Sequence, residues 1–515
     1  MCGIAGFCNF KEDFEENTDY WNFRLEKMRA VLAHRGNDAR GRYLKKHIGL
    51  SHSRLAIRDI LCGDQPMTRT HNGYEYTICY NGEIYNTDEL IPELSENGFV
   101  CSTTSDTEVI LYAYIHWGAD FVNRLNGIFA FAIWDAAKSR LLLYRDRVGV
   151  KPLFYAIRGD SLVFGSEPKA CFAHPAVKPE LDKQGLQELL AIGPAHTSGL
   201  SLFKDLFEVL PGHFMIYSQD GLHDETYWEL TSREHTESYR DTVAHTRFLV
   251  EDAIKRQMVS DVPVCTFLSG GIDSSIVTAI AANYMNTRGK TLNTFSFDFK
   301  DNDRYFKANA FQPERDLPYV NRMLEEYETA HSYLECDENS LFKALFAAVD
   351  AKDMPGMTDV DSSLLYFCSL VSRKNKVALT GECADEIFGG YPWFYRKELL
   401  ERYGFPWSSD VAPRLALLRD DVGLELDLSG YQAFQYEESR SKAPLLYGEA
   451  GEDESRRIIG YLNIKWFMQT LLDRMDRTSM YSELEARVPF ADHRIIEYVF
   501  NVPWHMKYQN GVEKT

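Results

Sequence analysis

The segment of residues 262–285 limits the fold of the second half of the chain more than any other feature. Its first part, VPVCTFLS, is almost wholly apolar, and SGGIDSSIVTAIAANYM follows as a turn that opens a helix. Short apolar runs of this kind are typical of strands buried in a parallel sheet. The runs NTFSFDF and KVALTGECADEIFGG repeat the order of strand and then loop. We therefore predict an α/β domain with helices packed on a mainly parallel sheet.

The first two hundred residues show a different pattern, in which short β-rich runs alternate with turn signals. The runs include YTICYNGEIYN, GIFAFAIWD and RLLLYRDRVGVKPLFYA, and a helical stretch runs from Ser105 to Trp117. This pattern predicts an α+β domain of layered sheets. A Pro-Gly turn and a polar stretch follow it. We predict a first domain over residues 2–210, a linker over 211–235 and a second domain over 236–515.

Composition is that of an ordinary globular enzyme, with 45% hydrophobic and 26% charged residues. A length of 515 residues fits two large domains, each with its own core. The formal net charge of −20 repels phosphate backbones and anionic lipid surfaces. Neither a nucleic acid nor a membrane is therefore expected as a partner.

The cysteines and the N-terminus indicate a compartment. The ten cysteines form no C-x-x-C pair, so neither structural zinc nor disulfides are expected. The N-terminal sequence lacks the basic region, apolar core and cleavage site of a secretory signal. No apolar run approaches the roughly 20 residues of a membrane span. A reducing, cytoplasmic location is predicted.

The cysteine at position 2 has a particular chemical option. Removal of Met1 would place the α-amine of Cys2 beside its own thiol. An α-amine has an unperturbed pKa of about 8 and can act as general base, directly or through water. Taken alone, a cysteine at this position is more often inert, so the surrounding motifs decide between the two interpretations.

The motifs MCGIAGF, LAHRGNDARG, SHSRLAIRD, YNGEIYN and TSDTEVIL occur in this order. In order and spacing they resemble the class II, N-terminal-nucleophile glutamine amidotransferases. The resemblance implies a layered glutaminase domain with Cys2 as nucleophile and Asn81 and Gly82 as the oxyanion hole. It also implies that Arg54 binds the glutamine α-carboxylate, with Glu83 and Asp106 near the α-ammonium. The implied glutamine-binding set is Arg54, Leu55, Ala56, Ile57, Arg58, Asn81, Gly82, Glu83 and Asp106.

These residue types suit a zwitterionic substrate. Arginine binds a carboxylate bidentately, and a preformed donor stabilises a tetrahedral oxyanion by about 2.7–4 kcal/mol. The alternative for Asn81-Gly82 is a type I′ hairpin turn, and each charged residue taken singly is typical of a solvated surface. Asn37 stands where the family commonly has proline, which predicts a small change in the loop without loss of chemistry.

The sequence SGGIDSS follows a predicted strand and opens a predicted helix, so its N–H groups and hydroxyls are placed to surround an anion. It lacks the Walker A pattern. It resembles instead the pyrophosphatase-type loop of enzymes that cleave ATP between the α- and β-phosphates. A Gly-Ser turn without a ligand is the alternative. The resemblance implies ATP binding by Leu268, Ser269, Gly270, Gly271, Asp273, Ser274, Ser275, Phe297, Thr380 and Gly381.

Acidic residues follow the apolar run KVALT, at the place where α/β sheets bind ligands. Cleavage at the α-phosphate suits the formation of an acyl-adenylate, with Mg²⁺ screening the triphosphate. The resemblance makes Asp273 and Asp385 the carboxylates that face Mg²⁺. It makes Glu382 the glutamate of adenylate formation and of the ammonia step. A solvated acidic loop is the alternative.

Two segments near the end complete the resemblance. LLDRMDRTSMYSELEARVPFAD matches a family segment that closes the aspartate site, with Arg487 and Asp492 in its signature and Glu483 where a small residue is usual. Lys514 aligns with a lysine expected to meet the phosphates and stabilise departing pyrophosphate. Taken alone, such a lysine is typical of a frayed tail. The family continues as a helix beyond this point, so a truncated chain is expected.

Together the two halves resemble glutamine-hydrolysing asparagine synthetases. This implies a ligase that converts aspartate, glutamine, ATP and water to asparagine, glutamate, AMP and pyrophosphate. The implied catalytic residues are Cys2, Asn81, Gly82, Glu382 and Lys514. Ammonia is expected to travel through a mostly apolar passage at the domain interface. Amidation of another small-acid or peptide carboxylate remains an alternative, as does an inactive scaffold or regulatory protein, and formation of a homo-oligomer is left open.

Overall fold

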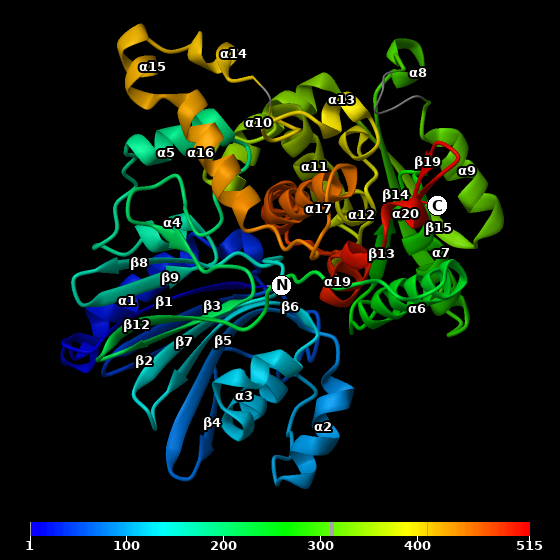
Figure 1. Ribbon diagram of the computed structural model, residues 1–515. Helices are drawn as coiled ribbons and strands as arrows, with labels where there is room; N and C mark the ends of the chain where they lie inside the picture. The colour runs from blue at the N-terminus through cyan, green and yellow to red at the C-terminus, as the bar shows by residue number, and fades with distance from the viewer. Residues whose placement is uncertain (1, 309–313, 409, 515) are drawn as a thin grey trace.

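The computed structural model describes residues 2–308, 314–408 and 410–514, which form two domains in contact (Figure 1). The first domain contains two six-stranded antiparallel sheets. The first sheet has the order β10 (Phe207–Glu208), β8 (Phe154–Arg158), β9 (Ser161–Gly165), β1 (Gly3–Asn9), β3 (Ile48–Arg54) and β2 (Ala39–Lys45). The second has the order β12 (Gly221–Thr226), β11 (His213–Ser218), β7 (Arg140–Arg145), β6 (Gly127–Asp135), β5 (Tyr74–Ile84) and β4 (Met67–His71).

Helices cover the outer faces of both sheets. The first sheet packs against α1 (Thr18–Ala30) and α4 (Pro168–Phe172), and the second against α2 (Thr87–Glu96) and α3 (Asp106–Trp117). Strand β1 is buried along its whole length, because both of its faces are covered. Its side chains alternate between these two faces. Ile4 and Cys8 lie between the sheets, whereas Ala5 and Phe7 face α1. Cys2 therefore precedes a strand that is covered on both sides.

The segment predicted as a linker, residues 211–235, contains two strands of the second sheet. Strand β11 pairs with β7 and contributes Phe214, Met215 and Tyr217 to the core. Both faces of β11 contribute to the core, because Phe214 packs with the cluster under α3 and Met215 and Tyr217 pack between the two sheets. We propose that the first domain extends through Thr226.

The second domain confirms the predicted α/β class. Its five-stranded sheet is parallel at every strand pair and has the order β15 (Thr329–Cys336), β14 (Leu292–Phe299), β13 (Val264–Phe267), β16 (Val377–Leu379) and β17 (Glu485–Arg487). The chain leaves β13 for β14 on one side and later returns to β16 on the other. The carboxyl ends of β13 and β16 therefore lie next to each other, at the topological switch point where α/β sheets bind ligands.

Helices pack on both faces of this sheet. One face is covered by α6 (Tyr239–Arg256), α7 (Ile272–Asn286) and α19 (His493–Asn501), and the other by α11 (Thr358–Val371), on which α10 (Glu338–Lys352) and α18 (Met468–Met480) pack. Among the described residues, no helix has both the length and the apolar character required to cross a membrane.

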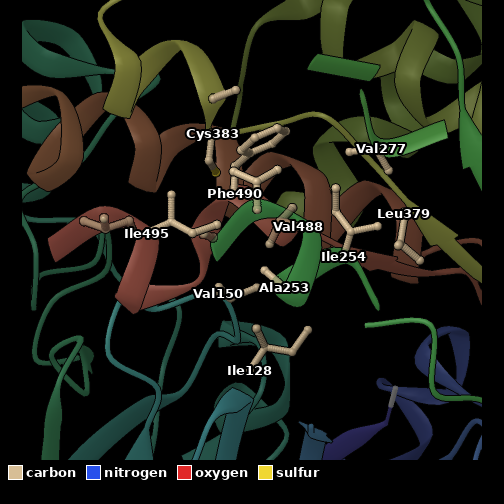
Figure 2. Packing of buried hydrophobic residues seen from close by; sticks show 14 of the residues in the cluster. Ile128, Val150, Ala253, Ile254, Val277, Leu379, Cys383, Val488, Phe490 and Ile495 are labelled. Atoms are coloured by element: carbon tan, nitrogen blue, oxygen red, sulfur yellow. The ribbon is translucent and has the colours of Figure 1, made fainter. Parts of the chain in front are cut away.

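One apolar cluster spans the interface between the domains (Figure 2). Ile128 and Val150 of the first domain pack with Ala253, Val488 and Phe490 of the second. Charged side chains are also buried at this contact, among them Arg35 and Lys151 of the first domain and Asp476 of the second. The first-domain side of this cluster comes from β6 and from the segments that follow β3 and β7.

Candidate functional site

The predicted nucleophile lies at the start of β1, close to the domain interface. The side chain of Cys2 is buried, and its main-chain nitrogen donates to Asn81 Oδ1 at 2.9 Å. Its Sγ lies 4.0 Å from the carbonyl oxygen of Leu55. Burial raises the pKa of the Cys2 thiol. The sulfur therefore needs a base to become a thiolate, since only the thiolate is a good nucleophile.

Asn81 and Gly82 lie within strand β5, paired with Ala130 and Phe129 of β6. The alternative of a hairpin turn is therefore wrong, because β5 continues through this pair. Asn81 Nδ2 is buried and has no hydrogen-bond partner among the described residues. Buried donors are rarely left unpaired, and this one lies beside the nucleophile.

Gly82 is required by close packing of the backbone. Its φ is +157°, and an added Cβ would lie 2.2 Å from the carbonyl oxygen of Ile128. Only glycine fits this position without displacing β6. The pair thus combines an orphaned amide donor with a backbone that approaches the neighbouring strand closely, which suits an oxyanion hole.

Glu83 and Asp106, the predicted partners of the glutamine α-ammonium, lie together in a buried pocket. Asp106 Oδ2 accepts from the main-chain N–H of Ile84 at 3.0 Å and from the hydroxyl of Tyr80 at 2.9 Å. The two oxygens of Glu83 each lie 3.3 Å from a guanidinium, one of Arg58 and one of the second domain. Burial and the Asp106 charge raise the pKa of Glu83.

Arg54 is buried, and the loop that follows it surrounds its guanidinium. Nη1 contacts the carbonyl oxygen of Ile60 at 3.1 Å and Asp64 Oδ1 at 2.9 Å, and Nη2 contacts the carbonyl oxygen of Asp59 at 2.5 Å. Arg54 therefore shapes the loop that carries the predicted residues 55–58. A bidentate contact with the glutamine α-carboxylate stays a prediction and requires these loop contacts to be exchanged.

The SGGIDSS loop connects β13 to α7 as predicted. Ser274 Oγ accepts from the main-chain N–H of Ser269 at 3.2 Å and donates to the carbonyl oxygen of Gly271 at 3.1 Å. Gly270 has φ +84°, and an added Cβ would lie 2.8 Å from the carbonyl oxygen of Asp316. The loop is thus held in shape by its own hydroxyls at the N-terminus of a fifteen-residue helix, where anions bind favourably.

The adenosine-side residues lie at the ends of β13 and β14. Leu268 donates its main-chain N–H to the carbonyl oxygen of Phe295, and both Leu268 and Phe297 line a narrow cavity of about 20 Å³. Phe297 also packs on Phe367, with ring centroids 5.2 Å apart. Both residues therefore pack in the protein core and also lie beside the predicted nucleotide site.

The loops after β13 and β16 meet at Gly381. A Cβ added there would lie 2.8 Å from the main-chain nitrogen of Ser274, so glycine permits the contact. Beyond it, Lys514 Nζ lies 2.6 Å from an oxygen of Asp273 and 2.6 Å from an oxygen of Asp385. Burial opposes protonation, but the two carboxylates raise the pKa of Lys514. The structure therefore unites three predicted residues from segments far apart in the sequence.

Lys514 reaches this position from a short hairpin of β18 (Tyr508–Gln509) and β19 (Val512–Glu513). Tyr508 stacks on Tyr395, with ring centroids 5.5 Å apart, and on Trp504. The interpretation of Lys514 as part of a frayed tail is therefore wrong, because ring stacking and two ion pairs hold the hairpin.

The residues present fit a magnesium ion shared with phosphates. Asp273 and Asp385 face a common point, because both contact the same ammonium group. Within the described ranges, no group of three or more His, Cys, Asp or Glu side chains is placed to hold a metal by itself. Mg²⁺ commonly binds through one or two carboxylates plus substrate phosphates, which matches this pair beside an anion-binding loop.

Glu382 faces a residue that sequence reasoning missed. Arg474 of α18 donates through Nη2 to Glu382 Oε1 at 3.0 Å and to Oε2 at 3.3 Å. The next residue, Cys383, is buried and has φ +76°. This conformation is costly for a residue other than glycine, and such strained residues cluster at functional sites. The available signal for Arg474 was the repeated Asp-Arg pair in LLDRMDR. Neighbouring residues of a helix point to different sides, so these charged side chains cannot all lie on one solvent-exposed face.

The role of residues 471–492 in closing the aspartate site stays a prediction. The side chain of Arg487 points into the glutaminase domain, and Asp492 binds Arg494 and Asn126. In this segment, Arg474 instead lies beside the synthetase loop. Glu483 has φ +57°, which explains why a small residue is usual there.

Comparison with known proteins agrees with this arrangement. Residues 1–228 match a family model described as a glutamine amidotransferase domain, and residues 245–515 match one described as asparagine synthase. The chain is 48% identical to asparagine synthetase [glutamine-hydrolyzing] 3 of Bacillus subtilis (strain 168), over all of this chain and 83% of the relative.

Two further relatives are more distant. A putative asparagine synthetase [glutamine-hydrolyzing] 2 of Methanocaldococcus jannaschii is 32% identical over 76% of each chain. Amidase chyE of Penicillium rubens is 29% identical over 98% of this chain and 83% of its own length. The two family models cover both domains, and a relative at 48% identity spans the whole chain. The chain belongs to the family of glutamine-hydrolysing asparagine synthetases.

Proposed function

We propose that this chain makes asparagine from aspartate through a β-aspartyl-AMP intermediate, with ammonia passed internally from glutamine hydrolysed at Cys2. One observation supports this most strongly. A buried nucleophile beside an orphaned amide donor and a preformed anion loop beside two carboxylates lie on opposite sides of one apolar interface. Each half supplies what the other lacks, since one releases ammonia and the other activates an acid.

The first half-reaction is assigned to Cys2 and Asn81. After removal of Met1, which lies outside the described residues, the α-amine of Cys2 takes the thiol proton. The thiolate attacks the glutamine amide carbon, and the oxyanion that forms accepts hydrogen bonds from Asn81 Nδ2 and the main-chain N–H of Gly82. The α-ammonium of Cys2 gives its proton to the leaving nitrogen, so that ammonia departs, and water then hydrolyses the thioester to glutamate and frees the thiol.

The second half-reaction is assigned to the loops after β13 and β16. The aspartate β-carboxylate attacks the α-phosphorus of ATP, and pyrophosphate leaves into the SGGIDSS loop. Lys514 stabilises its growing charge. Asp273 and Asp385 would hold Mg²⁺, which when bound would screen the phosphate charges. Glu382, oriented by Arg474, accepts a proton as ammonia attacks the acyl-adenylate and AMP departs.

The apolar cluster at the interface supports an internal passage for ammonia. Its first-domain end includes Leu55, whose carbonyl oxygen contacts Cys2 Sγ. Its second-domain end includes Cys383, which directly follows Glu382. Apolar walls disfavour the ammonium ion, so ammonia travelling along them keeps its nucleophilic lone pair.

We also propose that the protein works in the cytoplasm. All ten cysteines are free, and eight of them are buried. Free thiols are expected where the medium is reducing.

Product analysis with two nitrogen sources tests the proposal. With glutamine, ATP and aspartate, we expect asparagine, glutamate, AMP and pyrophosphate in equal amounts. The variant Cys2→Ala should lose synthesis from glutamine but retain synthesis from ammonium salts. Formation of ADP and phosphate, or full glutamine-dependent activity in the variant, would contradict it.

A further inference from the structure

The side chain of Arg487 starts in the second domain and ends in the glutaminase pocket of the first. Its Nη2 lies 3.3 Å from Glu83 Oε2 across the domain interface. Its Nε contacts Glu485 at 2.6 Å, and its Nη1 donates to the carbonyl oxygens of Gln257 and Val259 at 2.6 and 2.5 Å. Arg487 has 0% exposure, so these contacts fix its guanidinium on several sides.

Two arginines, one from each domain, hold the carboxylate of Glu83. Arg58 of its own domain holds Oε1 and Arg487 of the other domain holds Oε2, each at 3.3 Å. Buried carboxylates near one another cannot both ionise easily without cations. Burial and the Asp106 charge raise the pKa of Glu83, whereas Arg487 lowers it.

The strand that carries Arg487 is also bonded to the nucleotide-binding segment. The carbonyl oxygen of Arg487 accepts the main-chain N–H of Thr380 at 3.0 Å. Thr380 directly precedes Gly381, where the two loops of the synthetase site meet. The residue that touches Glu83 therefore belongs to the framework of the ATP site.

We propose that Arg487 is a positioning residue of the glutamine site, which holds the carboxylate of Glu83 in the orientation that meets the α-ammonium group of glutamine. The glutamine site is complete only when the second domain is docked on the first. This inference rests on the role of Glu83 in glutamine binding, which belongs to the proposed function.

Steady-state kinetics of Arg487→Gln test the inference. We expect the KM for glutamine to rise about 10-fold or more, because hydrogen bonds to charged groups contribute at least this factor, with a smaller change in kcat. Arg487→Lys, which keeps the charge, should restore part of the loss. Synthesis from ammonium salts should stay near the original rate. The matched control is Arg256→Gln, which breaks the interdomain pair of Arg256 with Glu89 at 2.6 Å and should leave the KM unchanged.

The pH profile supplies a readout that a purely structural role would not move. The charged groups around Glu83 are Arg58 and Asp106 from the first domain and Arg487 and Glu485 from the second. Glutamine binding requires ionised Glu83, so kcat/KM rises as pH increases through its pKa. Loss of the Arg487 cation raises that pKa. The acidic limb should therefore move to higher pH in Arg487→Gln and stay in place in Arg256→Gln.

The outcomes separate this inference from the role of Glu83. An unchanged KM in Glu83→Gln would refute that role. A raised KM in Glu83→Gln with an unchanged KM in Arg487→Gln would refute only the inference, as would equal loss of glutamine-dependent and ammonia-dependent synthesis. If Arg487→Gln does not fold, a double-mutant cycle of Arg487→Lys with Glu83→Gln decides, since additive effects on KM would overturn the coupling.

Discussion

At Asn81, the oxygen and the nitrogen of one buried amide group have different roles. Its oxygen accepts from the main-chain nitrogen of Cys2 at 2.9 Å, which fixes the orientation of the amide group. Its nitrogen is consequently directed elsewhere and lacks a partner among the described residues. An unpaired buried donor costs free energy in the resting protein, and an oxyanion that forms beside it recovers that cost.

Removal of this donor should therefore slow glutamine hydrolysis. For Asn81→Ala we expect kcat for glutamate release to fall by about 10²- to 10³-fold, the loss typical of one oxyanion donor. Ammonia-dependent asparagine synthesis should be retained, and Asn97→Ala, at an exposed position, serves as control. A glutamate release rate close to that of the original protein would exclude Asn81 from the oxyanion hole.

Lys514 is the second residue whose charge is directly testable. It lies 2.6 Å from both Asp273 and Asp385, and its loss leaves two carboxylates facing each other beside the phosphates. For Lys514→Gln we expect AMP formation to slow by about 100-fold, the usual effect of losing a charge that stabilises a transition state. Glutamine hydrolysis should persist. Lys374→Gln, at an exposed site of the same domain, should change neither rate.

Among the elements, α18 directs its charged side chains to two different places. Arg474 reaches Glu382 at 3.0 Å, and Asp476 binds both Arg35 at 2.8 Å and Lys151 at 3.1 Å. Successive helical residues point about 100° apart, so one helix serves the synthetase loop and the domain interface together. Asp476 is the only acceptor on this helix for two fully buried cations of the first domain among the described contacts.

Removal of the Asp476 charge should loosen the contact between the domains. For Asp476→Asn we expect the free energy of unfolding to fall by about 3–5 kcal/mol, because the buried charge of Lys151 loses its ion-pair partner and Arg35 keeps only Glu167, at 2.8 Å. Denaturant unfolding measures this. Lys376→Gln, which breaks the partly exposed interdomain pair with Asp38, should cost no more than about 1 kcal/mol. Equal losses in the two variants would contradict the argument.

The same pair predicts a dependence on pH. Burial disfavours the charge of Asp476, but Arg35 and Lys151 lower its pKa below the ordinary value. A carboxylate with a lowered pKa stabilises the folded state above its unfolded pKa, about 3.9, and this contribution is lost as pH falls through the folded value. Unfolding curves measured between neutral and acidic pH should therefore approach those of Asp476→Asn as pH falls. Parallel curves would be evidence against the ion pair.

For the molecule as a whole, the features that could be predicted from the sequence are those that depend on neighbouring residues in the chain. The SGGIDSS loop, the nucleophile and the strand pair around Asn81 follow from residue types in adjacent positions, and the structure brings the predicted residues together at two sites. The hairpin alternative failed at Asn81-Gly82 because tertiary pairing with β6, absent from the local pattern, continues the strand. The linker prediction overlapped two strands for the same reason.

Contacts between the domains could not be predicted from the sequence. Arg35 and Asp476 are separated by 441 positions, and Arg487 and Glu83 by 404. No local spacing relates such pairs, since only the docking of two separate cores places them together. The contact of Arg487 with Glu83 could therefore not be predicted from the family segment in which Arg487 lies.

The central claim for the whole molecule is that nitrogen passes between the two sites inside the protein. Synthesis from glutamine labelled with ¹⁵N in its amide group, in the presence of excess unlabelled ammonium, tests this claim most directly. Mass spectrometry of the product should show asparagine that carries mainly the label. Asparagine with the label diluted to the proportion in the surrounding solution would contradict the account.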